Sequence, residues 1–164
     1  MLLLSRAWNV LSPLWPHQAK ALADIDSAHR DGCRRLCVTS PTGGGKSRII
    51  TDLSVRFLGE GLKVALYTNR LALLEQLSSV LDERGIQHGI RSSGYADERH
   101  HRMQVCSIQT EHSRGVRSEK RNLHRAQLAL IDEAHVNRGG MADAILARHR
   151  EQGAFVVGFT ATPI

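Results

Sequence analysis

The stretch Ser40-Pro41-Thr42-Gly43-Gly44-Gly45-Lys46-Ser47 decides the fold. An apolar run at residues 36–39 precedes it, and apolar residues at helical spacing follow it, namely Ile49, Ile50, Leu53 and Phe57. This order is typical of a phosphate-binding loop, because glycines let backbone N–H groups converge on an anion at the positive end of a helix dipole. We therefore expect residues 42–47 to bind nucleotide phosphates, with Lys46 on the β- and γ-phosphates and the Ser47 hydroxyl on Mg²⁺. The alternative is a flexible glycine turn between a strand and a helix.

Two adjacent carboxylates follow a second apolar strand. Residues 127–131 are predicted to form this strand, and Asp132-Glu133-Ala134-His135 comes directly after it, about 85 residues beyond the glycine-rich loop. Ligands of open parallel α/β sheets bind beyond the carboxyl ends of the strands, so Asp132 and Glu133 are expected beside the phosphate-binding loop. We expect Asp132 to hold Mg²⁺ directly or through water, and Glu133 to orient and deprotonate the attacking water.

Further apolar segments alternate with helical patterns along the chain. Strands are predicted at residues 63–67, 86–90, 103–108 and 154–159. Helical patterns start near Trp15, Leu71 and Ala142, and Leu71 is expected on the apolar face of its helix. This alternation of about six strands with helices predicts a parallel α/β fold of three layers.

A glutamine near the start of the first helix is a candidate for contact with a nucleotide base. Gln18 follows Trp15-Pro16-His17, and a glutamine amide can make two hydrogen bonds to the N6 and N7 edge of adenine. The alternative is a solvated glutamine in the first turn of a surface helix. We favour adenine contact because a phosphate-binding loop follows downstream.

In their order along residues 15–163, these motifs resemble those of superfamily-two helicases of DEAD/DEAH type. Ser40 stands where the strict phosphate-loop pattern has glycine, and the superfamily-two loops tolerate a small residue there. The resemblance implies that residues 1–164 form the first RecA-like domain, a three-layer α/β P-loop NTPase domain with a mostly parallel central sheet. It also implies an ATP hydrolase that works as a helicase or translocase, with ATP and Mg²⁺ as cofactors.

The same resemblance implies roles for individual residues. The residues at the catalytic positions of the family are Lys46, Asp132, Glu133 and His135. The residues that would contact backbone phosphates of a nucleic acid are Arg70, in a segment that resembles motif Ia, and Gln109 and Thr110, in one that resembles motif Ic. Thr160 and Thr162, in the Thr-Ala-Thr-Pro of motif III, would couple the state of the nucleotide to bound nucleic acid.

Details of the motifs favour double-stranded DNA over RNA as the track. The Thr-Ala-Thr-Pro and Gly-Gly-Gly motifs look like those of the branch that includes restriction-enzyme motor subunits and excision-repair helicases. The second RecA-like domain of the family, with its arginine finger, has no counterpart in this sequence. We therefore expect poor activity from this chain alone, and a second helicase domain in a longer chain or a partner. The alternative is a nucleotide-dependent nucleic-acid-binding module without turnover.

Composition and charge set the remaining expectations. Lys and Arg number 22 against 16 Asp and Glu, and the net charge of +6 favours a polyanionic partner. Basic residues are dense between His112 and Arg125, including His124, which fits either a phosphate-tracking surface or a solvated helix face. No apolar run approaches the roughly 20 residues of a membrane span. Three cysteines without a C-x-x-C pair indicate a reducing compartment, so we expect a cytoplasmic monomer without a zinc site.

Overall fold

The computed structural model describes residues 13–41, 43–118, 122–134 and 140–161. The helices are α1 (Pro16–Arg30), α2 (Lys46–Gly59), α3 (Leu71–Glu83), α4 (Ile108–Glu111), the π-helix η1 (His112–Arg117) and α5 (Met141–Glu151). The strands are β1 (Arg35–Thr39), β2 (Val64–Thr68), β3 (His88–Arg91), β4 (Met103–Ser107), β5 (Leu128–Ile131) and β6 (Phe155–Thr160). In this part of the chain no helix combines the length and the apolar composition that crossing a bilayer requires.

The six strands form one sheet in the order β1-β6-β5-β2-β4-β3, and every neighbouring pair is parallel. Each residue of β2, β5 and β6 is buried. Parallel strands covered on both faces have this continuous apolar character, because the connecting helices pack above and below them. The predicted α/β fold with a parallel sheet is confirmed.

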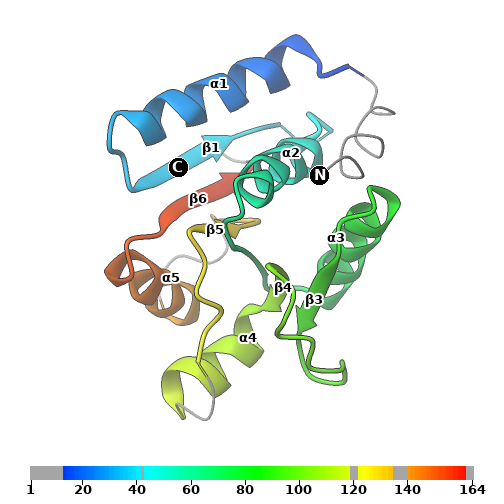
Figure 1. Ribbon diagram of the computed structural model, residues 1–164, viewed down its shortest axis with the longest axis vertical. Helices are drawn as coiled ribbons and strands as arrows, with labels where there is room; N and C mark the ends of the chain where they lie inside the picture. The colour runs from blue at the N-terminus through cyan, green and yellow to red at the C-terminus, as the bar shows by residue number, and fades with distance from the viewer. Residues whose placement is uncertain (1–12, 42, 119–121, 135–139, 162–164) are drawn as a thin grey trace.

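Helices cover both faces of the sheet, which gives the three layers (Figure 1). Apolar residues of α1, α2 and α3 pack against one face, where β2 contributes Val64 and Leu66. Residues of α4 and α5 pack against the other face, where β2 contributes Ala65 and Tyr67. Alternate residues of a strand point to opposite faces, so β2 contributes to both cores.

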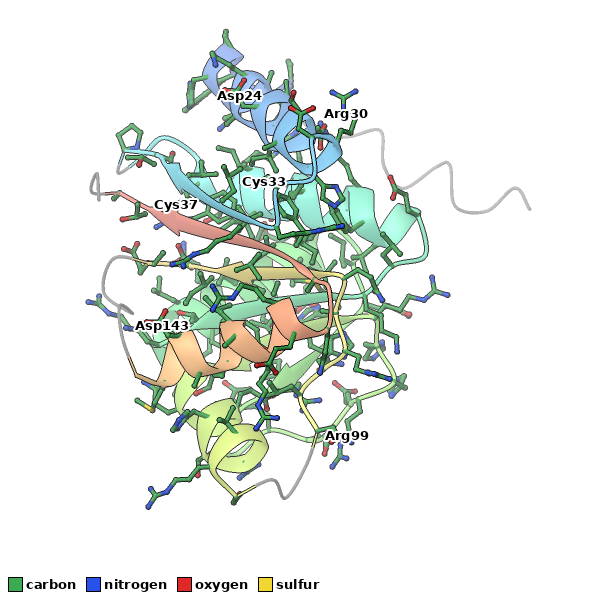
Figure 2. All side chains as sticks on the ribbon, turned by 90° about the vertical axis from the view of Figure 1, so that its left-hand side faces the viewer. Asp24, Arg30, Cys33, Cys37, Arg99 and Asp143 are labelled. Carbon is green, nitrogen blue, oxygen red and sulfur yellow. The ribbon has the colours of Figure 1, made fainter. Side chains whose placement is uncertain are left out.

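The strand β1 lies at one edge of the sheet and has β6 as its neighbour. Its residues alternate between exposed and half-buried positions, and Cys37 lies on the exposed side (Figure 2). The side chains of Leu36 and Val38 pack against the core that α1 and α2 cover. The edge strand β1, which leads into the glycine-rich loop, therefore packs against the core through one face.

Three details of the predicted elements were wrong. Ile108 is the first residue of α4 and not the last of a strand, because the Ser107 hydroxyl accepts the N–H group of Thr110 at 3.4 Å and caps a helix. The strand predicted at residues 86–90 is His88–Arg91. Leu71, expected on the apolar face of its helix, is 56% exposed.

Candidate active site

Three neighbouring strands end at the candidate active site. β1 leads into the glycine-rich loop, β5 leads into Asp132, and β6 lies between them, with Thr39 paired with Thr160 and Ile131 with Gly158. The Ser40 N–H group donates to the Thr160 carbonyl at 2.9 Å. The sheet thus brings the glycine-rich loop and the carboxylates to one edge, as parallel topology predicts.

The conformation of the loop requires its glycines. Gly43 and Gly45 have φ angles of +80° and +74°, in the left-handed region that side chains disfavour. The Gly44 N–H group donates to the Pro41 carbonyl at 2.9 Å, and a Cβ atom on Gly44 would lie 2.9 Å from that oxygen. The observed loop conformation therefore depends on glycine at these positions, and phosphate binding by the loop stays a prediction. Thr42 lies outside the described residues.

Lys46, at the first turn of α2, contacts both carboxylates across the sheet edge. Its Nζ lies 2.8 Å from Oδ1 of Asp132 and also donates to Oε1 of Glu133. Burial lowers the pKa of Lys46, but hydrogen bonds and charges of the two carboxylates outweigh burial, so its pKa lies above the ordinary value. The ammonium group is therefore charged and is held by two anionic partners.

Glu133 has an unusual backbone conformation. Its φ angle of +54° lies in the left-handed region, which costs a residue other than glycine about 1–2 kcal/mol. Its N–H group donates to Oδ1 of Asp132 at 2.9 Å, and the next N–H group, of Ala134, donates to the Phe159 carbonyl of β6 at 2.8 Å. These bonds hold Glu133 in a strained position of the kind that functional sites use. His135 lies outside the described residues.

The residues at this edge fit a nucleotide and Mg²⁺. The loop offers a lysine and the N-terminus of α2, and an anion is favoured at both. Mg²⁺ prefers few protein oxygens and keeps waters or phosphate oxygens as its other ligands. Asp132 and Ser47 offer oxygens of this kind at the sheet edge, and their role as Mg²⁺ ligands stays a prediction. No group of three His, Cys, Asp or Glu able to hold a metal occurs among the described residues.

The start of α1 packs against the loop. Gln18 is 5% exposed, its Oε1 accepts the Trp15 N–H group at 3.0 Å, and its Nε2 lies 3.4 Å from the Gly44 carbonyl. His17, which sequence reasoning passed over, binds the same carbonyl through Nε2 at 2.8 Å. Adenine contact by Gln18 stays a prediction, and each of these bonds leaves one lone pair of Oε1 and one hydrogen of Nε2 for another partner.

The residues predicted to contact nucleic acid lie just beyond the carboxyl ends of the neighbouring strands β2 and β4. Arg70 is exposed just before α3, and Gln109 is exposed and donates to the Asn69 carbonyl at 3.0 Å. Thr110 is 8% exposed, so its side chain is largely covered. The Gln109 bond therefore joins the segments that resemble motifs Ia and Ic, whereas Thr110 offers little surface in this conformation.

Only some of the basic residues in the stretch after α4 are exposed on the surface. Arg114, Arg117 and Arg125 are exposed. His124 is 6% exposed, and its Nε2 donates to the Arg102 carbonyl at 2.9 Å. Burial lowers the pKa of His124, so this residue does not belong to a basic surface, and the expectation that included it was wrong.

A family model described as "Type III restriction enzyme, res subunit" matches residues 12–164. The chain belongs to this family. A comparison with curated proteins found no match to this chain.

Solved structures with the same fold are helicases and related ATPases. The helicase domain of Hef from Pyrococcus furiosus has a TM-score of 0.72 and 21% identity, over 90% of the res-family chain and 33% of its own. The SWI2/SNF2 ATPase core of Sulfolobus solfataricus, solved with double-stranded DNA, has a TM-score of 0.71 and 14% identity, over 96% of this chain and 34% of its own. The UvsW helicase of bacteriophage T4 has a TM-score of 0.71 and 17% identity, over 94% of this chain and 54% of its own. The fold is that of a first RecA-like helicase domain, and the res-family chain spans about a third to a half of these proteins.

Sequence reasoning missed a buried polar group on the α4–α5 face of the sheet of this res-family chain. Nε of Arg91 lies 3.0 Å from Oε2 of Glu111, and the side chains are 3% and 0% exposed. The Tyr67 hydroxyl and Nε2 of His149 are 2.7 Å apart, and both residues are buried. The partners are far apart in sequence, so no local pattern separates these polar residues from solvated ones.

Proposed function

We propose that this chain is the ATP-binding domain of an ATP-dependent helicase or translocase that moves along nucleic acid, with double-stranded DNA favoured as the track. The observation that carries the proposal is the contact of Lys46 with both Asp132 and Glu133. A cation for phosphates, a carboxylate for Mg²⁺ and a carboxylate for the attacking water are the groups that phosphoryl transfer to water requires.

The contacts of Lys46 suggest how the site responds to a nucleotide. Transfer of the Lys46 ammonium from the carboxylates to phosphate oxygens would release Asp132 for Mg²⁺ and Glu133 for the water. Glu133 would then orient the water and take its proton. Bound Mg²⁺–ATP would supply the phosphoryl group, with the metal neutralising its oxygens. The strained backbone of Glu133, held by β6, supports a fixed position for this carboxylate.

Two features support an action on nucleic acid. Arg70 and Gln109 are exposed at the ends of neighbouring strands, where backbone phosphates can be bound, and the Gln109–Asn69 bond joins their segments. The Thr160 carbonyl accepts a hydrogen bond from the Ser40 N–H group, and this bond links the end of β6 directly to the glycine-rich loop. We assign the coupling of nucleotide state to nucleic acid to Thr160 and Thr162, and we favour double-stranded DNA because the similar SWI2/SNF2 core was solved with it.

Turnover would need a second helicase domain, in a longer chain or in a partner. An arginine finger stabilises the charge that develops on the transferred phosphoryl group and raises the rate by roughly 10³–10⁵. We propose that the second domain provides it. The matched structures, of which this chain covers 33–54%, leave room for such a domain.

Steady-state phosphate release, with and without duplex DNA, tests this proposal. Residues 1–164 should bind ATP but release phosphate very slowly, and a form extended by a second helicase domain should show turnover stimulated by DNA. In that form Glu133→Gln should remove turnover and leave ATP bound. Brisk, DNA-stimulated turnover by this chain alone would contradict the two-domain mechanism. ATP binding without turnover in the extended form would instead favour a nucleotide-dependent binding module.

A further inference from the structure

The side chain of His17 reaches from the first turn of α1 to the middle of the glycine-rich loop. Its Nε2 lies 2.8 Å from the Gly44 carbonyl oxygen, 27 residues away in the sequence. A carbonyl oxygen only accepts, so Nε2 carries the proton and donates. We propose that His17 is a positioning residue of the phosphate-binding loop, which fixes the peptide between Gly44 and Gly45; this inference rests on the proposed binding of a nucleotide by that loop.

The geometry of a peptide bond explains what His17 would fix. The described residues contain no cis peptide bond, and in a planar trans peptide the C=O and N–H groups point in opposite directions. Because the Gly44 carbonyl points to His17, the N–H group of Gly45 points away from that side chain. Backbone N–H groups at this place in a glycine-rich loop are the donors that hold phosphate oxygens. His17 therefore sets the direction of one such donor.

This peptide needs a restraint because glycine lies on both sides of it. Glycine populates positive and negative φ about equally, so a Gly-Gly peptide rotates more readily than others. The neighbouring bonds are already fixed. The Gly44 N–H group binds the Pro41 carbonyl at 2.9 Å, and the Gly45 carbonyl accepts the Arg48 N–H group at 2.9 Å as α2 begins. The Gly44 carbonyl is held by Nε2 of His17 at 2.8 Å, and Nε2 of Gln18 is a second, longer donor at 3.4 Å.

The start of α1 holds His17 in place. Gln18, the next residue, is buried and accepts the Trp15 N–H group, which fixes the first turn of the helix. The contact with the loop is close, since a Cβ atom on Gly45 would lie 2.0 Å from Nε2 of Gln18. The Trp15 ring packs against the His17 ring with centroids 5.6 Å apart. His17 is thus oriented toward the loop by its neighbours.

A residue that acts through the loop backbone affects phosphate binding, whatever base is attached. Loss of the His17 hydrogen bond should lower the affinities for ATP, GTP and inorganic tripolyphosphate by the same factor. One hydrogen bond of this kind corresponds to roughly a two- to tenfold change in affinity. Contact with the base would behave differently, because it would change the ratio between ATP and GTP and leave tripolyphosphate unaffected.

Titration calorimetry on the 164-residue chain with these three ligands and Mg²⁺ tests the inference. His17→Ala should weaken the binding of all three ligands by the same factor. His17→Gln should recover part of the lost affinity, because the glutamine amide also donates a hydrogen bond. Ser27→Ala, which changes an exposed neutral residue of the same helix, should leave the affinities unchanged. His17 is exposed, so the variants should fold, and equal thermal midpoints would verify this. Wild-type affinity in His17→Ala, or an effect confined to ATP, would overturn the inference alone. Failure of the wild type to bind any of the ligands would overturn the proposed function and the inference with it.

Discussion

Replacing Glu111 with Gln should strongly destabilise the protein, although Glu111 lies outside the candidate active site. Oε2 of Glu111 is 3.0 Å from Nε of Arg91, and neither side chain is more than 3% exposed. Burial lowers the pKa of Arg91, but the Glu111 carboxylate outweighs it and raises the pKa above its ordinary value. An arginine is not deprotonated in proteins, so Glu111→Gln would leave a buried charged guanidinium without its carboxylate. Removal of one member of a buried pair costs about 3–5 kcal/mol. We expect about 3 kcal/mol, because glutamine can still accept one hydrogen bond.

Urea unfolding followed by circular dichroism measures this loss. Such a cost is a large share of the about 5–15 kcal/mol that stabilises a typical domain. Asp97→Asn is the matched control, since it breaks an ion pair with Arg99 whose side chains are 38% and 61% exposed, and it should cost far less than the loss of the buried pair. The double variant Arg91→Met with Glu111→Leu should be more stable than Glu111→Gln, because no charge is left buried. A Glu111→Gln variant as stable as Asp97→Asn would refute this reasoning.

Three other predictions concern pH, nucleic acid and the base. Burial, together with His124 and Arg91, lowers the pKa of His149 from 6.5 to about 4, so the unfolded chain binds this proton first as pH falls. Stability should be complete above pH 6.5 and fall by about 3 kcal/mol toward pH 4, and unfolding of His149→Gln should lack this component; an equal pH dependence in both proteins would contradict it. In fluorescence anisotropy, binding to duplex DNA should weaken steeply with salt, and Arg70→Ala should reduce the salt slope by about one; salt-independent binding would remove the electrostatic argument. Gln18→Ala should reduce the preference for ATP over GTP, whereas equal affinity of the wild type for both nucleotides would reject adenine contact.

Much of the fold could be predicted because buried parallel strands and amphipathic helices have simple patterns. The four apolar residues predicted for α2, Ile49, Ile50, Leu53 and Phe57, are all buried. Continuous apolar runs indicated β2, β5 and β6, whose residues are covered on both faces. The pattern failed where a local polar contact decided the structure. Ile108 continues the alternating strand pattern of residues 103–108, but the Ser107 cap begins a helix at Ile108.

The gathering of Lys46, Asp132 and Glu133 at one edge of the sheet was predictable, but their contacts were not. Strand ends mark Lys46, Asp132 and Glu133, because parallel topology gathers such ends at one edge. Periodicity does not encode strand order, so it could not predict that β6 lies between β1 and β5. It does not encode side-chain conformation either, so it could not predict that Lys46 contacts both carboxylates. The His17 bond to Gly44 is likewise a contact between distant segments. His124, counted as a surface cation, showed that composition does not report burial.

The measurement that tests the central claim most directly is calorimetric titration of ATP, with and without Mg²⁺, into the wild type and Lys46→Ala. Lys46 is the cation that bridges Asp132 and Glu133, and we propose that it moves to the phosphates of the nucleotide. The wild type should bind ATP in a Mg²⁺-dependent manner, and Lys46→Ala should lose binding. Lys20→Ala, which removes an exposed lysine of α1, should bind as the wild type does. Equal binding of Mg²⁺–ATP by the wild type and Lys46→Ala would contradict the assignment of this loop as the nucleotide site.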